Sequence, residues 1–314
     1  MATVQAICTS DRRGTQKSPI QSASFAPEWG ILGDAHGGNW HRQVSLLSAD
    51  KIEEFKLRGA QVDAGAFGEN LVVSGLDFSA LPVGTLLRCG SVLLEMTQIG
   101  KECHAHCAIY HRMGDCIMPR EGVFARVLEP GVISVGDEMA VEERTGKRPF
   151  QAAVITLSDK GAKGQREDTS GPAIAVRLRG AGYEVVEALL LSDDRPELEQ
   201  QLCRLCDSRQ VDLILTTGGT GLSPRDVTPE ATLAVAHCQA PGIAEAIRAH
   251  SLSITPRAMF SRGVAVVRGR TLIINLPGST KAVQESLDCL MPALDHGLTV
   301  LRGNAGGCGT DAST

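Results

Sequence analysis

The sequence has few aromatic residues and no long apolar run. Phe, Trp and Tyr make up 4% of its 314 residues, which disfavours a surface that binds nucleic acid by stacking bases on aromatic rings. No run of about 18 apolar residues occurs, so no membrane-spanning helix is expected. The net charge of −5 at pH 7 gives no electrostatic basis for binding nucleic acid or an anionic membrane.

A secretory signal is also lacking, because no basic segment followed by an apolar core opens the chain. Ten cysteines without such a signal fit a reduced compartment better than a disulfide framework. We therefore expect a cytoplasmic protein. A length of 314 residues suits two domains.

The stretch 211–230 carries the clearest functional pattern in the chain. Residues 213–215 are apolar and predict a buried strand, which runs directly into the glycine loop 218–221. Asp226 follows, and Thr228 precedes a proline and a glutamate, which predicts a helix with Thr228 as its N-cap. A strand, a glycine loop and a helix start in this order are typical of an anion site at the carboxyl end of a sheet.

Apolar strands alternate with helical patterns throughout residues 151–303. One of the helices is expected over 170–178 with Ser170 as its cap, and another opens at Pro196. This alternation predicts a three-layer α/β domain with a mostly parallel sheet covered on both faces. The strands are expected at residues 152–157, 185–191, 213–215, 264–267 and 271–274.

Ligands bind at the carboxyl ends of the strands in such sheets, so four strand ends are expected to share one site. Backbone N–H groups there suit phosphates, and Asp193 and Asp226 suit Mg²⁺, which takes one or two carboxylates. A solvated turn is the alternative for Asp193, whereas Asp194 is expected to cap a helix. The candidate residues at this edge are Ser158, Asp159, Asp193, Gly218, Gly219, Thr220, Gly221, Asp226, Asn275, Pro277, Gly278 and Lys281.

The first half has a different pattern, with short strands separated by glycines and one helix expected over 49–58 after Ser48. Such segments predict a β-barrel over residues 1–142. Residues 143–150 are charged and unpatterned, which indicates a linker. Residues 304–314 are rich in glycine and are expected to be a disordered tail.

Two polar clusters in the first half leave alternatives open. Residues 33–36 and 40–43 suit an anionic or heteroaromatic ligand, and they suit a solvated loop equally well. Residues 101–107 hold two cysteines and two histidines, too close together for an ordinary structural zinc site. A reactive thiol favoured by neighbouring cationic groups is the better functional interpretation, and buried reduced cysteines are the structural one.

Several short motifs in the first half together resemble a MOSC domain. They are Gly33-Asp34-x-His36, Phe67-Gly68-Glu69-Asn70-Leu71, Val83-Gly84-Thr85, Gly100-Lys101-x-Cys103 and Val135-Gly136-Asp137-Glu138. That family is similar to the C-terminal part of molybdenum-cofactor sulfurase. The resemblance implies a β-barrel with one functional cysteine, Cys107 or Cys103, that binds molybdopterin-type ligands or carries sulfur.

The second half closely resembles the molybdopterin adenylyltransferase family, the MogA/MoaB-like proteins. The motifs that carry the resemblance are Ser158-Asp159, Asp168-x-Ser170-Gly171, Thr217-Gly218-Gly219-Thr220-Gly221, Pro224-Arg225-Asp226-Val227-Thr228-Pro229-Glu230, Pro241-Gly242, Ser261-Arg262 and Asn275-Leu276-Pro277-Gly278. The resemblance implies that molybdopterin and MgATP give adenylylated molybdopterin and pyrophosphate.

The same resemblance assigns roles to single residues. The family's essential acidic positions fall on Asp193 and Asp226, its nucleotide-loop threonine on Thr220 and a pterin-contacting serine on Ser251. The proline that usually precedes the first aspartate is Ser192 here. The family forms trimers, so a homotrimer is expected, with a molybdenum-insertion enzyme or a molybdoenzyme as a further partner.

Three functions follow for the whole chain. The first is a cofactor-biosynthesis enzyme whose second domain adenylylates molybdopterin while the first handles the cofactor or its sulfur. The second is a non-catalytic carrier or scaffold that binds molybdopterin. Acidic residues at both essential family positions, Asp193 and Asp226, favour the enzyme. The third makes the first domain a sulfur transferase, which requires a thiol of depressed pKa.

Overall fold

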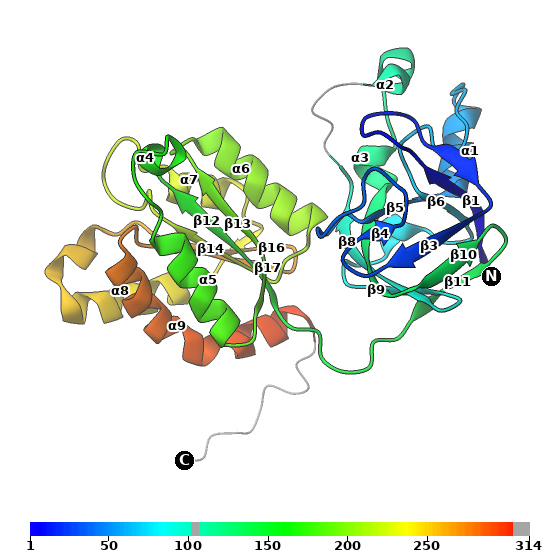
Figure 1. Cartoon of the computed structure of the whole chain (residues 1–314). Coiled ribbons are helices and arrows are strands. Elements are labelled where there is room, and N and C mark those ends of the chain that lie inside the picture. Colours follow the sequence, from blue (N-terminus) through cyan, green and yellow to red (C-terminus); the bar gives the residue numbers. More distant parts are fainter. Residues whose placement is uncertain (102–106, 304–314) are drawn as a thin grey trace. The chain divides into compact units, whose positions relative to one another are not determined.

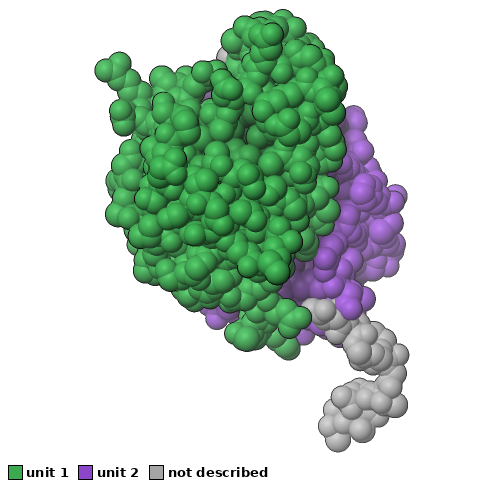
Figure 2. Space-filling model, turned by 90° about the vertical axis from the view of Figure 1, so that its right-hand side faces the viewer, with its two compact units in different colours: residues 1–148 green, residues 149–314 purple. Residues whose placement is uncertain are grey.

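The computed structural model describes residues 1–101 and 107–303. The chain forms two compact units, Met1–Arg148 and Pro149–Thr314, which Figure 2 colours separately. The expected tail, residues 304–314, lies outside the described residues. No helix in the described ranges is long and apolar enough to cross a membrane.

The first unit is built on seven strands that pair in a closed ring, because β11 at one end of the sheet also pairs with β1 (Figure 1). All neighbours in the ring are antiparallel except β5 and β6. The predicted β-barrel is therefore confirmed. The ring order is β11 (Glu138–Glu142), β7 (Leu86–Cys89), β8 (Val92–Ile99), β9 (Val123–Glu129), β5 (Val44–Ser48), β6 (Leu71–Ser74) and β1 (Ala2–Thr9).

Smaller elements surround this barrel. Strand β2 (Ser18–Ile20) extends the sheet beside β1, and β10 (Gly131–Ser134), β3 (Ser22–Ala26) and β4 (Gly30–Ile31) form a second, three-stranded sheet. The helix expected after Ser48 is present as α1 and buries Ile52 and Phe55. The helical segments of the unit are α1 (Ala49–Leu57), η1 (Phe78–Ala80), α2 (Ala108–Met113) and α3 (Met118–Glu121).

A buried polar network centred on Asn70 joins separate strands and loops of the barrel. The Asn70 amide nitrogen donates to the Cys8 carbonyl at 3.0 Å and to Asp34 Oδ2 at 3.2 Å. Its amide oxygen accepts from the Ser45 backbone N–H at 3.1 Å. Buried polar groups are costly unless they are hydrogen-bonded, so these bonds hold the segments in one arrangement.

Asp34 belongs to this network rather than to a solvated loop. Its side chain is 1% exposed and forms an ion pair with Lys17 Nζ at 2.8 Å. It also accepts a hydrogen bond from the Ser10 backbone N–H at 3.0 Å. Burial lowers the pKa of Lys17, and the bond to Asp34 opposes that effect. The solvated-loop alternative is therefore wrong for this residue.

The second unit contains a six-stranded sheet of order β13-β12-β14-β17-β16-β15. The first four strands run parallel, and β16 and β15 are antiparallel to their neighbours. The strands are β12 (Gln151–Leu157), β13 (Glu184–Leu191), β14 (Leu213–Thr217), β15 (Cys238–Gln239), β16 (Ala265–Arg268) and β17 (Thr271–Leu276).

Helices cover both faces of this sheet (Figure 1). Alternate residues of β12 face opposite sides: Ala152 and Val154 pack with α5, α8 and α9, and Ala153 and Ile155 pack with α6 and α7. The predicted three-layer α/β domain with a mostly parallel sheet is confirmed. The helical segments are α4 (Asp159–Ala162), α5 (Ser170–Gly180), α6 (Arg195–Cys203), η2 (Arg204–Ser208), α7 (Thr228–Ala234), α8 (Pro241–Ile254), η3 (Pro256–Phe260) and α9 (Thr280–Leu301).

The predicted cap of α6 is confirmed, and the predicted caps of α5 and α7 are wrong. Asp194 caps α6 as predicted, accepting from the Glu197 backbone N–H. Ser170 is the first residue of α5 and not its cap: the N-cap position is Thr169, and one carboxylate oxygen of Asp168, the residue before it, accepts from the backbone N–H groups of Ser170 and Gly171. Thr228 is the first residue of α7 and not its N-cap, because its hydroxyl donates instead to the Gly218 carbonyl.

We predict that Asn70→Ala destabilises the first unit by at least about 2 kcal/mol, because several buried groups lose their partner together. Both tryptophans of the chain, Trp29 and Trp40, belong to this unit, so their fluorescence in a urea titration reports its unfolding. The control is Gln5→Ala, whose amide bonds to Ser74 at an exposed position and whose effect should stay within about 0.5 kcal/mol. Equal unfolding midpoints for the two variants would contradict the prediction.

Candidate functional site

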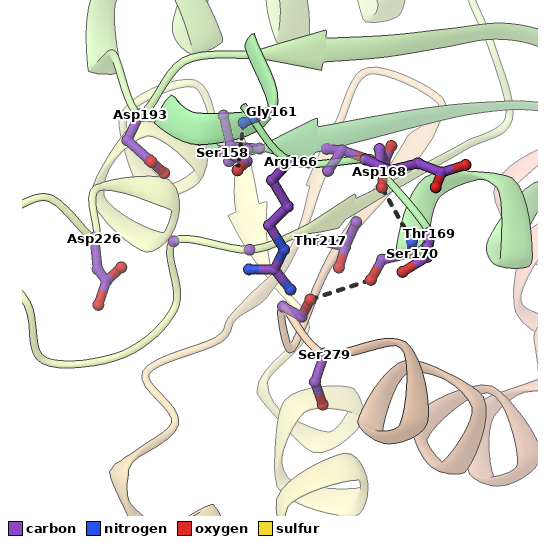
Figure 3. Close-up of a pocket in the computed structure, with 16 residues that line it drawn as sticks. Ser158, Gly161, Arg166, Asp168, Thr169, Ser170, Asp193, Thr217, Asp226 and Ser279 are labelled. Atoms are coloured by element: carbon purple, nitrogen blue, oxygen red, sulfur yellow. Dashed lines mark hydrogen bonds between the residues drawn. The ribbon is translucent and has the colours of Figure 1, made fainter. Parts of the chain in front are cut away.

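A pocket of about 350 Å³ lies at the edge of the second sheet where β12 and β14 end (Figure 3). The loop after β17 and the start of α5 contribute to its wall. The residues that line it are Thr156, Leu157, Ser158, Gly161, Arg166, Glu167, Asp168, Thr169, Ser170, Asp193, Thr217, Gly218, Gly219, Asp226, Gly278 and Ser279.

Two glycines let the loop after β14 reach the pocket. Gly218 has φ +96°, and a Cβ on it would lie 2.3 Å from the Leu157 carbonyl oxygen. Gly219 has φ +62°, and a Cβ there would lie 2.4 Å from Thr228 Oγ1. A side chain at either position is therefore excluded both by conformation and by space. The backbone of the glycine loop lines the pocket at Gly218 and Gly219 because these residues have no side chain.

Asp193 and Asp159 hold each other through reciprocal bonds to the backbone. The Asp159 N–H donates to the Asp193 carboxylate at 3.0 Å, and the Asp193 N–H donates to the Asp159 carboxylate at 3.2 Å. Arg225 then binds both oxygens of Asp159 through Nη2, at 2.8 and 2.9 Å. This chain of contacts connects the loop after β14 to the ends of β12 and β13, and it fixes where Asp193 lies.

Asp193 and Asp159 differ in the charges that surround them. Burial raises the pKa of Asp193, and the negative charges of Asp159 and Asp226 raise it further. The hydrogen bonds from Arg225 lower the pKa of Asp159 instead. Asp159 is therefore committed to an ion pair, whereas Asp193 lines the pocket and would gain from a cation.

Asp226 lines the same pocket from a loop that Arg262 braces. One carboxylate oxygen of Asp226 accepts from the Ser223 N–H at 2.9 Å, which closes a tight turn. The Arg262 guanidinium donates to the Gly221 and Asp226 carbonyl oxygens, both at 2.6 Å, and forms an ion pair with Glu230. The glycine loop and Asp226 are therefore held as one piece.

Hydroxyl groups line the side of the pocket opposite Asp193 and Asp226 in Figure 3. Ser170 Oγ donates to the Gly278 carbonyl at 3.1 Å, and Thr217 Oγ1 donates to the Pro277 carbonyl at 2.7 Å. Thr156 is 6% exposed, and its Oγ1 has no hydrogen-bond partner among the described residues. Such an orphaned polar atom in a pocket wall suits a bound ligand.

The structure brings together six of the residues predicted for this site and leaves the others outside the lining. Ser158, Asp193, Gly218, Gly219, Asp226 and Gly278 line the pocket. Those outside the lining are Asp159, Thr220, Gly221, Ser251, Asn275, Pro277 and Lys281.

The residues outside the lining have other surroundings. Asn275 is buried, and its amide nitrogen donates to the hydroxyls of Thr216 and Thr232, both at 2.9 Å. The side chain of Lys281 is 85% exposed and lies 3.8 Å from Glu285 one turn along α9. Ser251 lies in the last turn of α8.

Sequence reasoning did not select several lining residues, including Thr156, Arg166, Thr217 and Ser279. Thr156 is the second-last residue of a strand, and Thr217 directly precedes the glycine loop, so their places next to predicted residues could have indicated them. Arg166 lies in the loop between α4 and α5, where no pattern in the sequence marks the direction of a side chain.

The pocket suits a hard divalent cation only in part. Two carboxylates, Asp193 and Asp226, line it, and Mg²⁺ usually takes one or two carboxylates together with phosphate oxygens and water. Within residues 1–101 and 107–303 no group of three or more His, Cys, Asp or Glu side chains is placed to hold a metal. The residues present therefore fit a cation that arrives with a phosphate ligand.

The first unit places its described thiols differently. Cys107 is exposed at the start of α2, whereas Cys8, Cys89 and Cys116 are buried. Burial raises the pKa of Cys8 and of Cys89 to about 11. Cys103, the other predicted thiol, lies outside the described residues. A second pocket, of about 430 Å³, lies between α2 and residues 60–66.

The chain resembles known proteins in both halves. Residues 153–296 match the family model "Probable molybdopterin binding domain", and residues 33–140 match the MOSC domain model. The molybdopterin adenylyltransferase of Helicobacter pylori strain 26695 is 40% identical over 153 residues, which are 48% of this chain and 87% of that protein. That of Escherichia coli K12 is 42% identical over 142 residues, 44% of this chain and 72% of that protein.

Among solved structures, the molybdopterin biosynthesis enzyme MoaB of Thermus thermophilus is 48% identical with a TM-score of 0.47, and the match covers 49% of this chain and 97% of that one. The family of this chain follows from these two relatives, because the chain covers most of their length at 40% identity or above. The chain therefore belongs to the molybdopterin adenylyltransferase family through its second unit, and it carries a MOSC domain in its first.

Proposed function

We propose that the second unit transfers the adenylyl group of ATP to molybdopterin. The observation that carries this proposal is the pocket in which Asp193 and Asp226 line the wall together with the glycine loop. A carboxylate pair beside phosphate-binding amides suits nucleotidyl transfer, which demands positioning and charge neutralisation more than covalent chemistry by the protein. Curated relatives named molybdopterin adenylyltransferase support the same reaction.

In this reaction an oxygen of the terminal phosphate of molybdopterin attacks the α-phosphorus of ATP. The bond from that phosphorus to the bridging oxygen of the β-phosphate breaks, and pyrophosphate leaves. Asp193 and Asp226 would hold Mg²⁺, which supplies positive charge to the phosphate oxygens when bound. In this proposal the backbone N–H groups of Gly218 and Gly219 bind phosphate oxygens, and the Thr156 hydroxyl, which has no partner among the described residues, is a further donor in the pocket wall.

The remaining predicted residues receive supporting roles in this proposal. Asp159 positions Asp193 through the reciprocal bonds and is itself held by Arg225. Thr220 is buried, and its carbonyl accepts from the Arg262 N–H, so it holds the glycine loop in place. Ser251 remains the residue proposed to contact the pterin, on the family resemblance alone.

The first unit is proposed to bind the cofactor or to carry its sulfur. Cys107 is the exposed thiol among the described cysteines of this unit, and it lies at the start of α2, a helix that lines the second pocket. A sulfur carrier needs an accessible thiolate, which a buried thiol of raised pKa does not provide. A homotrimer and an acceptor enzyme remain the proposed partners.

We predict that Asp226→Asn lowers the rate of pyrophosphate release by about 10²–10³-fold with ATP binding partly retained. The amide keeps an acceptor for the Ser223 N–H but removes the charge. The assay uses purified protein, molybdopterin, ATP and Mg²⁺. Asp194→Asn is the control, because it makes the same change at a residue that caps α6 outside the pocket lining. Undiminished turnover in Asp226→Asn would exclude this role, and tight molybdopterin binding without product in the unmodified chain would favour the carrier.

We predict that kcat/KM has an acid limb above the ordinary Asp pKa of 3.8, because burial and neighbouring carboxylates raise the pKa of Asp193. Activity should be present above that raised pKa and should be lost as the pH falls through it, since a protonated carboxyl no longer attracts a cation. Asp159→Asn removes a negative neighbour and releases Arg225, and both changes favour the Asp193 carboxylate. The limb should therefore move to lower pH in this variant. A limb that stays in place or moves to higher pH would count against Asp193 as the titrating group.

We predict that iodoacetamide alkylates Cys107 faster than Cys8 or Cys89 in the native protein, because Cys107 is exposed and the other two are buried thiols with a pKa of about 11. Peptide mass spectrometry gives the rate at each cysteine over a range of pH. A Cys107 rate that levels off below pH 7 would support sulfur carriage. Labelling of Cys107 no faster than of Cys8 would rule it out as the functional thiol.

A further inference from the structure

Arg166 is the cationic side chain in the wall of the adenylylation pocket, within the residues that the structure describes. It lies on the loop between α4 and α5 and is exposed. In Figure 3 its guanidinium extends into the space between Asp226 and Ser279. No hydrogen bond or ion pair joins it to another described residue.

Three other cationic side chains near the pocket have partners in the protein. Arg225 binds Asp159, and Arg262 binds Glu230 and two backbone carbonyls. Lys281 lies near Glu285 and outside the lining. The guanidinium of Arg166 is therefore the one of these positive groups whose donors are available to a ligand.

The other charged side chains in the pocket wall are acidic, and this bears on what Arg166 could bind. Glu167, Asp168, Asp193 and Asp226 all line the pocket, yet none of them pairs with Arg166. Asp168 is occupied by the backbone N–H groups at the start of α5. Asp193 and Asp226 together favour a metal cation. A free guanidinium beside such carboxylates suits a ligand that carries negative charge of its own into the pocket.

The pocket wall near Arg166 also favours a phosphate. The first turns of α5, 11 residues long, and α9, 22 residues long, meet there, with Thr169 Oγ1 and Thr280 Oγ1 2.7 Å apart. Helix N-termini carry partial positive charge. The Thr156 hydroxyl, which is buried and lacks a partner among the described residues, lines the same pocket. Anion-binding groups and cation-binding carboxylates thus face one cavity.

We propose that the Arg166 guanidinium binds a phosphate group of a substrate in this pocket and thereby sets the affinity for that substrate. This inference rests on the proposed adenylylation. The phosphate belongs either to ATP or to molybdopterin, and the recognised chemistry is the same: oxygens of a phosphate ester that accept two N–H bonds from a planar guanidinium.

The test compares Arg166→Gln and Arg166→Lys with the unmodified chain. Calorimetry measures the binding of Mg²⁺ with α,β-methylene-ATP, which cannot transfer its adenylyl group, and separately the binding of molybdopterin. We expect Arg166→Gln to weaken binding of one or both by about tenfold or more, and Arg166→Lys to recover part of the loss. A loss confined to the nucleotide assigns the contact to ATP, and a loss confined to molybdopterin assigns it to the pterin phosphate.

Arg179→Gln is the matched control, because it removes the same charge from an exposed position in the last turn of α5. It should change either affinity less than about twofold, and the melting temperatures of all three variants should differ little. Arg166→Gln affinities equal to those of Arg179→Gln would overturn the proposal, and so would an unmodified chain that binds neither ligand at millimolar concentration.

The binding measurements keep this proposal separable from the proposed activity. If the unmodified chain binds both ligands but releases no pyrophosphate, the adenylylation fails, and the effect of Arg166→Gln on affinity still decides the role of Arg166. If turnover occurs and Arg166→Gln changes neither the dissociation constants nor KM, the activity stands and the guanidinium contact is wrong.

Discussion

The close approach of three strand-end loops controls the geometry of the second unit. Gly218 passes the Leu157 carbonyl so closely that a Cβ would lie 2.3 Å from its oxygen, and a Cβ on Gly278 would lie 3.3 Å from Gly218 Cα. Parallel pairing of β12, β14 and β17 places these loops at one edge, but only the missing side chains let them converge. A side chain at Gly218 would therefore force the glycine loop away from the end of β12.

Around this contact the fold uses ionic groups to fix positions more than to add stability. Arg225 is 62% exposed, so its pair with Asp159 contributes little to the free energy of unfolding. It nevertheless determines where Asp159 lies, and Asp159 in turn determines where Asp193 lies. Arg262 does the same for the glycine loop and Asp226. These contacts hold two like charges, Asp193 and Asp226, in the wall of one pocket.

The sequence predicts which segments meet at the site better than it predicts which side chains face it. Strand patterns placed Asp193, Asp226 and Gly218 at one edge, because parallel strands end together. They did not separate Thr156, which lines the pocket, from Asn275, which bonds to buried hydroxyls, since both lie near strand ends. Lys281 follows the last loop but lies on the exposed side of α9, because the helix turns it away.

In the first unit, too, the sequence motifs do not show which side chains are accessible. Asp34 and Asn70 belong to its most recognisable motifs, yet both are buried and bond to strands, loops and Lys17. A buried ion pair costs desolvation, so its value here is to specify one arrangement of the chain. These motif residues mark the barrel in the sequence because their buried hydrogen bonds hold its strands and loops together. Among the described thiols of this unit, the buried ones are Cys8, Cys89 and Cys116, and Cys107 is exposed.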